Sequence, residues 1–325
     1  MMNAAIETVF GSAMDALSHI LDDIHFSHAE YLYVLGENGH GIRLAPQQGV
    51  MFYVVLQGEL FLTLEHDQQR LPLRTGNVLM LPFRTPHQIC FGEPQCRRPL
   101  HDLQGEFRGH RNDPVMVYTN QSSHLLLGVR CQIDTEMAAP LFAGLPDYLR
   151  VSGEDELSRP EWLRIGLEFL ALETQLARPG RDSLMNRLIG MFLVECIRDY
   201  VEQLSSDSES WLVALQDPQL SVVLTALHQH PERPWTVAEL ARMACMSRSA
   251  FAAHFHTVMH QPPLGYLVQH RLRLAARALR RQQHSIARIS EQVGYSSESA
   301  FSQAFRRAYG ISPGQYRRQF SDKNA

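Results

Sequence analysis

Two stretches near the C-terminal end of the chain repeat one pattern: MSRSAFAAHFHTVMH at residues 246–260 and YSSESAFSQAFRRAYG at residues 295–310. Each contains a Ser-Ala-Phe triplet and a second phenylalanine four residues after the first. Phenylalanines at positions i and i+4 lie on one face of a helix. Both stretches are therefore predicted to be helices with a buried aromatic face, formed by Phe251 and Phe255 in the first and by Phe301 and Phe305 in the second.

The similarity continues on both sides of these stretches, which makes the C-terminal segment an internal duplication. Residues 237–240 match residues 286–289 at an offset of 49, and Pro263 matches Pro313 at an offset of 50. The second copy therefore has one extra residue in its turn. Each copy is predicted to be a short helix, a tight turn and a second helix.

The turn of each copy carries its own sequence signals. Gly294 follows the last apolar residue of its helix, where a left-handed turn is expected. Ser247 in the first copy, and Ser296 or Ser297 in the second, are predicted to cap the helix that follows. This arrangement is the helix-turn-helix plan, in which the second helix enters the major groove of DNA.

The outward faces of the two second helices are the predicted DNA-contacting surfaces. Outward side chains of such helices read base edges, while basic groups beside them contact phosphates. We expect methyl contacts to thymine from the first helix, cytosine recognition by Glu298 and adenine recognition by Gln303. The predicted DNA-binding residues are Arg248, Ser249, Ala252, Ala253 and His256 in the first copy, and Glu298, Ser299, Ser302, Gln303, Arg306 and Arg307 in the second.

An arginine-rich segment joins the two copies. Residues 264–284 are predicted to form a helix that sets the spacing of the reading helices, which is about 34 Å for successive major grooves. Residues 228–325 hold 14 Lys or Arg and 5 Asp or Glu, a balance of +9, whereas residues 1–227 hold 16 and 29, a balance of −13. Double-stranded DNA is therefore the expected partner of the basic segment. Phosphate contacts are expected from its arginines, which include Arg271, Arg273, Arg277, Arg280 and Arg281.

The rest of the chain is predicted to have a different architecture. Residues 25–135 contain short β-branched and aromatic runs separated by turn signals, which is typical of an all-β sandwich or barrel. The broad apolar surface of the predicted helices in residues 158–204 indicates a dimerisation region. We expect an α+β multidomain protein with a sensory domain at 1–150, a helical linker at 151–227 and an all-α DNA-binding domain at 228–325.

Composition restricts the cellular environment of the chain. It contains no apolar run of about eighteen residues, so no membrane span is expected. The first residues lack the basic region of a signal peptide. Five cysteines, an odd number, argue against a secreted disulfide framework and favour the reducing cytoplasm.

Residues from about 230 to 320 resemble the DNA-binding domain of AraC/XylS-type transcription regulators. The resemblance rests on WTVAELARMACMSRSAFAAHF (235–255) and SIARISEQVGYSSESAFSQAFRRAYGISPGQYRR (285–318). It implies that the two outward helix faces read bases. The chain departs from the family pattern at Ala253 and Gln303, where many members carry arginine, and at His260, where glycine is usual.

The strand-rich region resembles the cupin-like sensory domain of one branch of these regulators, on the stretch FYVVLQGELFLTLEHDQQRLPLRTGNVLMLPFRTPHQI (52–89). Cupin enzymes hold a metal with several histidines and a carboxylate. Here residues 52–55 supply no ligand, and only His87 remains at the second motif. We therefore expect no metal, no cofactor and no enzymatic activity. A cupin enzyme fused to DNA-binding helices is the alternative, and the sequence leaves open whether further histidines converge: His25, His28, His40 and His110.

The candidate sensor residues are Tyr53, His87, Cys90 and Cys96. A reactive thiol needs exposure and a lowered pKa, and positive charge from His87 and Arg97-Arg98 would lower it. The alternative for His87 is a strand-end histidine bonded to backbone. Among the other cysteines, Cys131 is expected in the core, and Cys196 and Cys245 on buried helical faces.

These features predict a cytoplasmic, sequence-specific DNA-binding transcription regulator that a small apolar or reactive molecule controls through the N-terminal domain. A homodimer is the expected assembly, and RNA polymerase is a further candidate partner. The alternative is a redox- or electrophile-sensing regulator switched at Cys90 and Cys96.

Overall fold

The computed structural model describes residues 15–24, 26–45, 49–67, 69–82, 85–107, 114–118, 121–151, 161–175, 179–205, 207–282 and 284–321. The chain divides into two compact units, one formed by His25–Gln203 and the other by Met1–Ile24 together with Leu204–Ala325. The α+β multidomain organisation expected from the sequence is confirmed. Across the described ranges, every helix is too short or too polar to traverse a bilayer.

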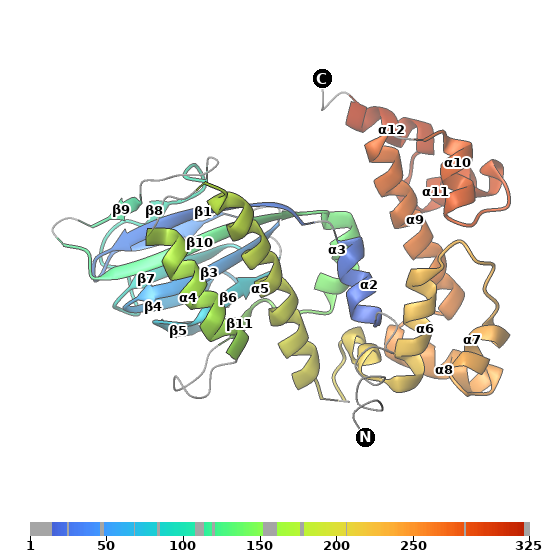
Figure 1. The fold of residues 1–325 in the computed structure, drawn as a ribbon, viewed down its shortest axis with the longest axis horizontal. Helices are drawn as coiled ribbons and strands as arrows, with labels where there is room; N and C mark the ends of the chain where they lie inside the picture. Colours follow the sequence, from blue (N-terminus) through green and yellow to red (C-terminus); the bar gives the residue numbers. More distant parts are fainter. Residues whose placement is uncertain are drawn as a thin grey trace. The chain divides into compact units, whose positions relative to one another are not determined.

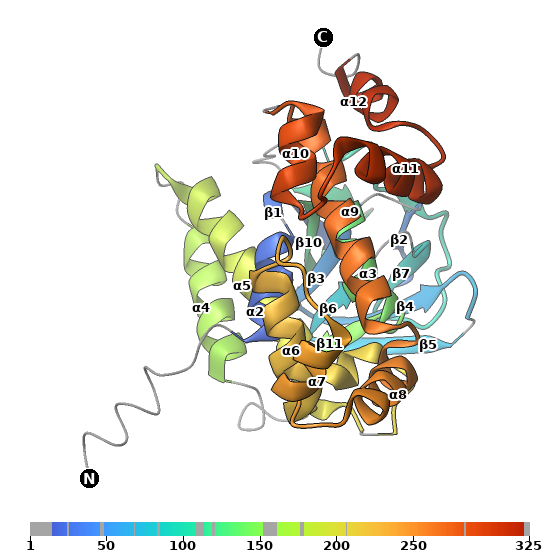
Figure 2. The same cartoon turned by 90° about the vertical axis from the view of Figure 1, so that its right-hand side faces the viewer.

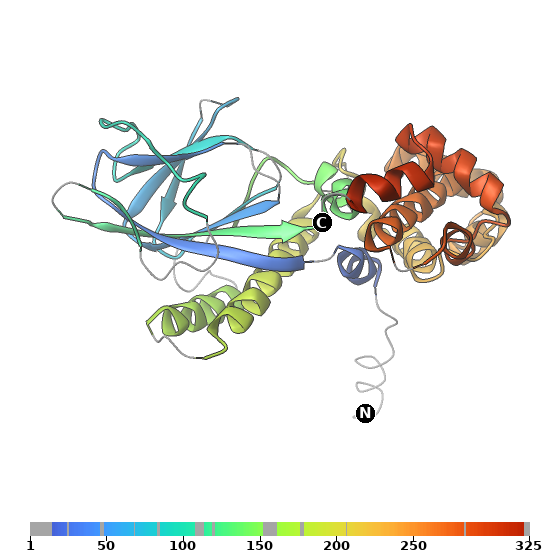
Figure 3. The same ribbon diagram turned by 90° about the horizontal axis from the view of Figure 1, so that it is seen from above.

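The first unit is a sandwich of two β-sheets (Figure 3). The six-stranded sheet has the order β11-β6-β3-β10-β1-β9, and the five-stranded sheet has the order β5-β4-β7-β2-β8. Neighbouring strands are antiparallel, except that β9 runs parallel to β1 and β8 runs parallel to β2. The strands are β1 Phe26–Gly36, β2 Gly41–Leu44, β3 Val50–Gln57, β4 Glu59–Leu64, β5 Arg70–Arg74, β6 Val78–Leu81, β7 His87–Phe91, β8 His101–Asp102, β9 Val115–Val117, β10 His124–Ile133 and β11 Leu149–Val151.

The core of this unit lies between the two sheets, and Met51, Tyr53 and Val55 of β3 point into it. The outer face of the six-stranded sheet is covered by two helices, α4 (Glu161–Gln175) and α5 (Arg181–Gln203) (Figure 1). A strand covered on both faces buries successive residues instead of alternate ones. This explains why β3 begins with six consecutive buried residues, VMFYVV. A third helix, α3 (Thr135–Ala143), follows β10.

The second unit is helical and contains two apolar clusters joined by one long helix, α9 (Pro263–Arg281) (Figure 2). The cluster at the start of α9 includes Phe251 and Phe255, and the cluster at its end includes Phe301 and Phe305. The remaining elements are α2 Ala16–Asp23, the short 3-10 helix η2 Trp211–Leu215, α6 Pro218–Gln229, α7 Val237–Met243, α8 Arg248–Met259, α10 Ile286–Gln292, α11 Glu298–Tyr309 and α12 Pro313–Ser321.

The compact units differ from the domain boundaries that the sequence suggested at residues 150 and 227. Helix α6 belongs to the C-terminal unit because Leu220, Val223 and Leu227 pack in the same cluster as Phe251. Helix α2 packs against α6 and also belongs there, although it precedes all the strands. The helices α4 and α5 belong to the strand-rich unit, since α5 packs against β1 and β11.

Candidate functional site

The second helices of the two helix-turn-helix copies, α8 and α11, begin as the sequence predicted. We call them the reading helices, after the role predicted for them. The side chain of Ser247 accepts a hydrogen bond from the backbone N–H of Ala250, and that of Ser297 accepts one from Ala300. Of the two serines considered for the cap of α11, Ser296 and Ser297, it is therefore Ser297 that caps the helix. Gly294 has the expected left-handed conformation, with φ of +84°. Its counterpart in the first copy is Cys245, with φ of +53°, which a residue with a side chain adopts at a cost.

The four phenylalanines of the repeat lie in the interior, as predicted. Each of them is 0% exposed, and the paired rings are 5.7 Å apart in α8 and 5.6 Å apart in α11. In each copy a tyrosine from the following helix packs edge-on against the second ring, Tyr266 in the first and Tyr316 in the second. Because the two copies have the same aromatic arrangement, each in its own cluster, equivalent faces of α8 and α11 point outward.

The outward faces carry the residues predicted to contact DNA. Both helices lie on the same side of α9 (Figures 1 and 2). Ala252 and Ser302 are half-buried, and the other nine are exposed: Arg248, Ser249, Ala253, His256, Glu298, Ser299, Gln303, Arg306 and Arg307. Within the described residues, Arg248, Arg306 and Arg307 form no ion pair. Their guanidinium groups are therefore available to a polyanion.

Arg271 of α9 has a role that the sequence analysis missed. Its guanidinium donates hydrogen bonds to three backbone carbonyls: Pro231 at 2.6 Å, Arg233 at 2.8 Å and Gly294 at 3.0 Å. The first two lie in the segment that leads into the first helix-turn-helix unit, and the third lies in the turn of the second. Arg271 thus ties both units to the helix between them, and we call these three bonds the Arg271 clamp.

The expectation that the arginines of α9 contact phosphates needs correction. Besides Arg271, Arg277 forms an ion pair with Asp23, and Arg280 donates to the Tyr316 hydroxyl at 2.9 Å. These side chains stabilise the fold of the unit, and they are partly buried. Arg281 at the end of the helix is exposed.

Tyr53 and His87, two of the predicted sensor residues, meet inside the β-sandwich. The Tyr53 hydroxyl lies 2.7 Å from His87 Nε2, and His87 Nδ1 lies 2.7 Å from the carbonyl of Thr85. Burial lowers the pKa of His87 to about 4, although the Thr85 carbonyl opposes the shift. His87 is therefore neutral near pH 7. Its Nδ1 is bonded to backbone at the strand end, as the alternative interpretation expected, whereas its Nε2 faces the Tyr53 hydroxyl.

Cys90 and Cys96, the other two predicted sensor residues, form a disulfide bond. Cys90 lies on β7, where Ile89 and Phe91 point into the core and His87 is buried against Tyr53. Because neighbouring residues of a strand face opposite sides, Cys90 points away from His87. The idea that His87 activates Cys90 is therefore wrong, since the imidazole is neutral and lies on the other face. Of the two arginines expected to supply charge, Arg97 pairs with Glu93 at 2.7 Å, and Arg98 lines the pocket beside the disulfide.

A pocket of about 560 Å³ adjoins this disulfide on the outer face of the five-stranded sheet. Its polar side chains come from β4, β5, β7 and the loop after β7. The lining residues are Thr63, Arg70, Gln88, Cys90, Pro94, Gln95, Cys96, Arg98, Pro99 and Leu100. Two guanidinium groups beside a disulfide make this surface suitable for a polar or anionic molecule.

The other cysteines agree with the sequence analysis in two cases of three. Cys131 and Cys196 are buried, and burial raises the pKa of both thiols. Cys245 is exposed at the turn between α7 and α8, so its prediction as a buried helical residue is wrong. Of the histidines considered for a cupin metal, His25 and His110 and the side chain of His28 lie outside the described residues, and His40 is half-buried.

Comparison with known proteins assigns both units. A cupin family model matches residues 15–202, and a helix-turn-helix domain model matches residues 240–319. The chain therefore belongs to the AraC-type DNA-binding transcription regulators with an N-terminal cupin domain.

Individual relatives resemble most of the chain. It is 42% identical over 307 residues to the HTH-type transcriptional regulator AlkR of Acinetobacter baylyi, and the aligned residues cover 94% of this chain and 100% of AlkR. It is 43% identical over 308 residues to a putative AraC-like transcription regulator of Streptomyces lividans, covering 94% and 98% of the two chains. Among solved structures, the DNA-binding domain of AdpA in complex with a target DNA is 33% identical, covers 33% of this chain and 96% of that chain, and has a TM-score of 0.31.

Proposed function

We propose that this transcription regulator reads two successive major grooves of its operator and that a small molecule received by the cupin domain controls this binding. The observation that carries the proposal is the Arg271 clamp between two equivalent, outward-facing reading helices. A pair of helices held at fixed positions on one rigid helix suits a duplex that repeats its major groove about every 34 Å.

The two reading faces differ in chemistry, so we expect them to read DNA differently. The face of α8 is formed mostly by small side chains, and Ala252 and Ala253 suit methyl contacts to thymine. The face of α11 is polar: Glu298 suits a cytosine amino group, and Gln303 suits an adenine. Arg248, Arg306 and Arg307 are assigned to phosphates, together with the serines and His256 at the margins of the two faces.

The pocket beside the disulfide is the proposed effector site. Its volume of about 560 Å³ lies within the range of roughly 300–1,000 Å³ that is usual for small-molecule sites. Arg70 and Arg98 favour an effector with an acidic or strongly polar group, in place of the small apolar molecule that the sequence suggested. Strand β7 forms part of the pocket wall with Gln88 and Cys90, and it carries His87, bonded to the buried Tyr53, on its other face. A bound molecule would therefore act on the Tyr53–His87 pair through this strand.

The α4–α5 surface is the proposed homodimer interface. A groove of about 440 Å³ runs between the two helices, and its lining is almost entirely apolar. Ile165, Phe169, Leu184 and Met191 are 41% to 61% exposed there. Clusters of exposed large apolar side chains on a helix pair usually mark an association site. A dimer would place two copies of the DNA-binding unit on one operator, in the cytoplasm and within reach of RNA polymerase.

The Cys90–Cys96 disulfide favours a second candidate, a redox-controlled regulator. In the reduced protein a two-electron oxidant such as a peroxide would convert one thiolate to a sulfenic acid, releasing hydroxide from the peroxide. Attack by the second thiol would then form the disulfide and release water. The net change is the loss of two electrons and two protons from the thiol pair. The disulfide closes the loop after β7, which is also the wall of the pocket.

Base selection from random DNA tests the DNA-reading part of the proposal. Replacing Gln303 by alanine should relax the preference at one base position of the selected site and leave the other positions unchanged. Gln229, exposed on α6 and outside both reading faces, provides the matched control Gln229→Ala. Identical selected sites for wild type and Gln303→Ala would remove α11 as the reader of that base.

Comparing the response of Cys90→Ser and Cys96→Ser with that of wild type separates the two control mechanisms. A redox regulator loses its response to peroxide in either variant. A ligand-controlled regulator keeps its response to effector in at least one of them and loses it in Arg98→Glu, which reverses a charge in the pocket wall.

A further inference from the structure

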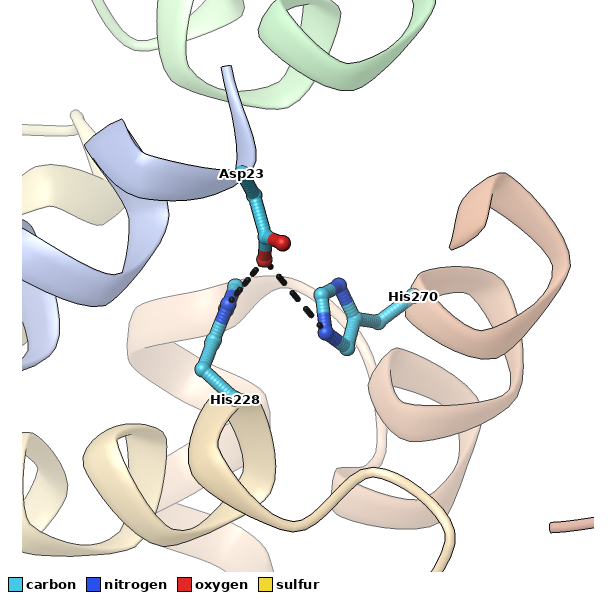
Figure 4. Close-up of side chains that lie close together, drawn as sticks. All are labelled: Asp23, His228 and His270. Carbon is cyan, nitrogen blue, oxygen red and sulfur yellow. Dashed lines mark hydrogen bonds and ion pairs between the residues drawn. The ribbon is translucent and has the colours of Figure 1, made fainter. Parts of the chain in front are cut away.

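A second group of ionisable side chains lies in the helical unit, outside both reading faces (Figure 4). It consists of Asp23 at the end of α2, His228 in α6 and His270 in α9. One carboxylate oxygen, Asp23 Oδ2, lies 3.2 Å from His228 Nδ1 and 3.7 Å from His270 Nε2. All three atoms lie within 4.8 Å of one another, so three ligand atoms from three helices converge on one point.

The nitrogen of His270 in this cluster has unused bonding capacity. The residue is 1% exposed, and its Nε2 has no hydrogen-bond partner among the described residues. Buried polar atoms are normally bonded, so an unbonded one that points at a carboxylate requires an explanation.

The two separations from Asp23 Oδ2 to the histidine nitrogens are close to those around a tetrahedral metal ion. Zn²⁺ binds histidine nitrogen and carboxylate oxygen at about 2.0–2.2 Å, which places two ligands of a tetrahedron about 3.3–3.6 Å apart. The observed separations of 3.2 Å and 3.7 Å lie on either side of this range. Two histidines and one carboxylate are also a common protein ligand set for zinc.

The residues around the cluster hold its ligands in place. The Tyr266 hydroxyl lies 2.7 Å from His228 Nε2, the nitrogen that faces away from the cluster. Arg277 contacts the other oxygen of Asp23 at 3.5 Å and the Asp23 backbone carbonyl at 2.8 Å. Oδ2 is left to face the two histidines. Such outer partners orient ligands in known metal sites.

We propose that Asp23, His228 and His270 bind one divalent transition-metal ion, Zn²⁺ by preference, within the DNA-binding unit. An exchangeable water would complete the tetrahedron.

Such an ion would link α2 to α9, the helix that joins the two helix-turn-helix units. Asp23 belongs to α2, and His270 belongs to α9, one residue before the Arg271 clamp. In sequence, only two residues separate α2 from the first strand of the cupin domain. Metal binding would therefore stabilise the junction through which the chain passes from the sensor to the DNA-binding unit.

Metal analysis of the tag-free, full-length protein tests this proposal. After chelator treatment and dialysis against Zn²⁺, the wild type should retain one equivalent per chain, and Co²⁺ in its place should give the visible absorption of a four-coordinate ion. His270→Gln and Asp23→Asn should lose more affinity than the roughly 10–100-fold expected for Tyr266→Phe, which removes only an outer partner. Zinc should also raise the unfolding temperature of the wild type.

Two control variants make the result specific. His230→Gln removes an exposed histidine two residues from His228, and Cys245→Ser removes the exposed thiol, so both should bind zinc as the wild type does. A cooperative unfolding transition in each metal-free variant would show that the variant is folded. The Co²⁺ spectrum is measured on the wild type alone, so it does not depend on the folding of any variant. Absence of a stoichiometric ion in the wild type overturns the proposal. Retention by His270→Gln, or loss in Cys245→Ser, overturns it as well.

Discussion

Replacing Arg271 by alanine removes the clamp that joins the two helix-turn-helix units to α9. The side chain donates to three backbone carbonyls, at 2.6, 2.8 and 3.0 Å. A hydrogen bond to a charged group contributes about 1.5–3 kcal/mol when it is buried. Arg271 is half-buried, and water replaces part of each lost bond, so about 1 kcal/mol for each is appropriate. We therefore expect Arg271→Ala to lower the free energy of unfolding by about 3 kcal/mol.

The conservative variant Arg271→Lys should recover only part of this loss. Lysine retains the charge, but its ammonium group cannot span three carbonyls as the planar guanidinium does. The expected loss is about half that of alanine. Arg281→Ala is the matched control, because Arg281 is exposed on the same helix, and its effect should stay within about 0.5 kcal/mol.

Tryptophan fluorescence during urea unfolding measures this effect in the correct unit. Of the 3 tryptophans, Trp162 lies in the cupin domain, whereas Trp211 and Trp235 lie in the helical unit. In a Trp162→Phe background the signal reports only the helical unit, and Trp235 lies two residues from one of the clamped carbonyls. Equal midpoints for Arg271→Ala and the parent protein would refute the assigned role of the clamp.

Three further predictions rest on single contacts. Gly310→Ala should lower the free energy of unfolding by about 1 kcal/mol, since φ is +77° but the space around a Cβ is open. Gly294→Ala should lower it by about 3 kcal/mol, because its Cβ would also lie 2.5 Å from the carbonyl oxygen of Glu232. Unfolding midpoints measure both effects. The pKa of His87 is about 4 in the folded chain against an ordinary 6.5, so between these pH values the unfolded chain binds a proton that the folded chain does not bind. Stability should fall by roughly 3 kcal/mol between pH 6.5 and pH 4, and His87→Gln should remove this loss in acid titrations. Phe169→Glu should convert a dimer to a monomer in sedimentation experiments, whereas Val222→Glu, at an equally exposed residue of α6, should not; a dimer in both variants would contradict the proposed interface.

Local patterns predicted the reading heads well because their structure depends on neighbours in sequence. Phenylalanines four residues apart, a serine cap and a left-handed glycine each act within one or two turns of chain. Cys245 was misplaced even though the repeat offset of 49 aligns it with Gly294. That alignment was the available signal for an exposed turn.

The features that the sequence did not reveal depend on long-range contacts. Arg271 looked like one of several basic residues on a helix, and only the packing of α9 brings the three carbonyls to it. One feature is a local exception: His87 and Cys90 lie three residues apart on β7, so the alternation of a strand already places them on opposite faces. Helix α2 joins the C-terminal unit although the strands of the other unit follow it at once.

The spacing of the protected bases on a selected operator tests the central claim most directly. Full-length protein should protect two major-groove segments on one face of the duplex, about 10–10.5 base pairs apart, and inserting half a turn between them should abolish high-affinity binding. A single protected segment, or unchanged affinity after the insertion, would contradict an account in which α8 and α11 are held on α9 to grip successive grooves.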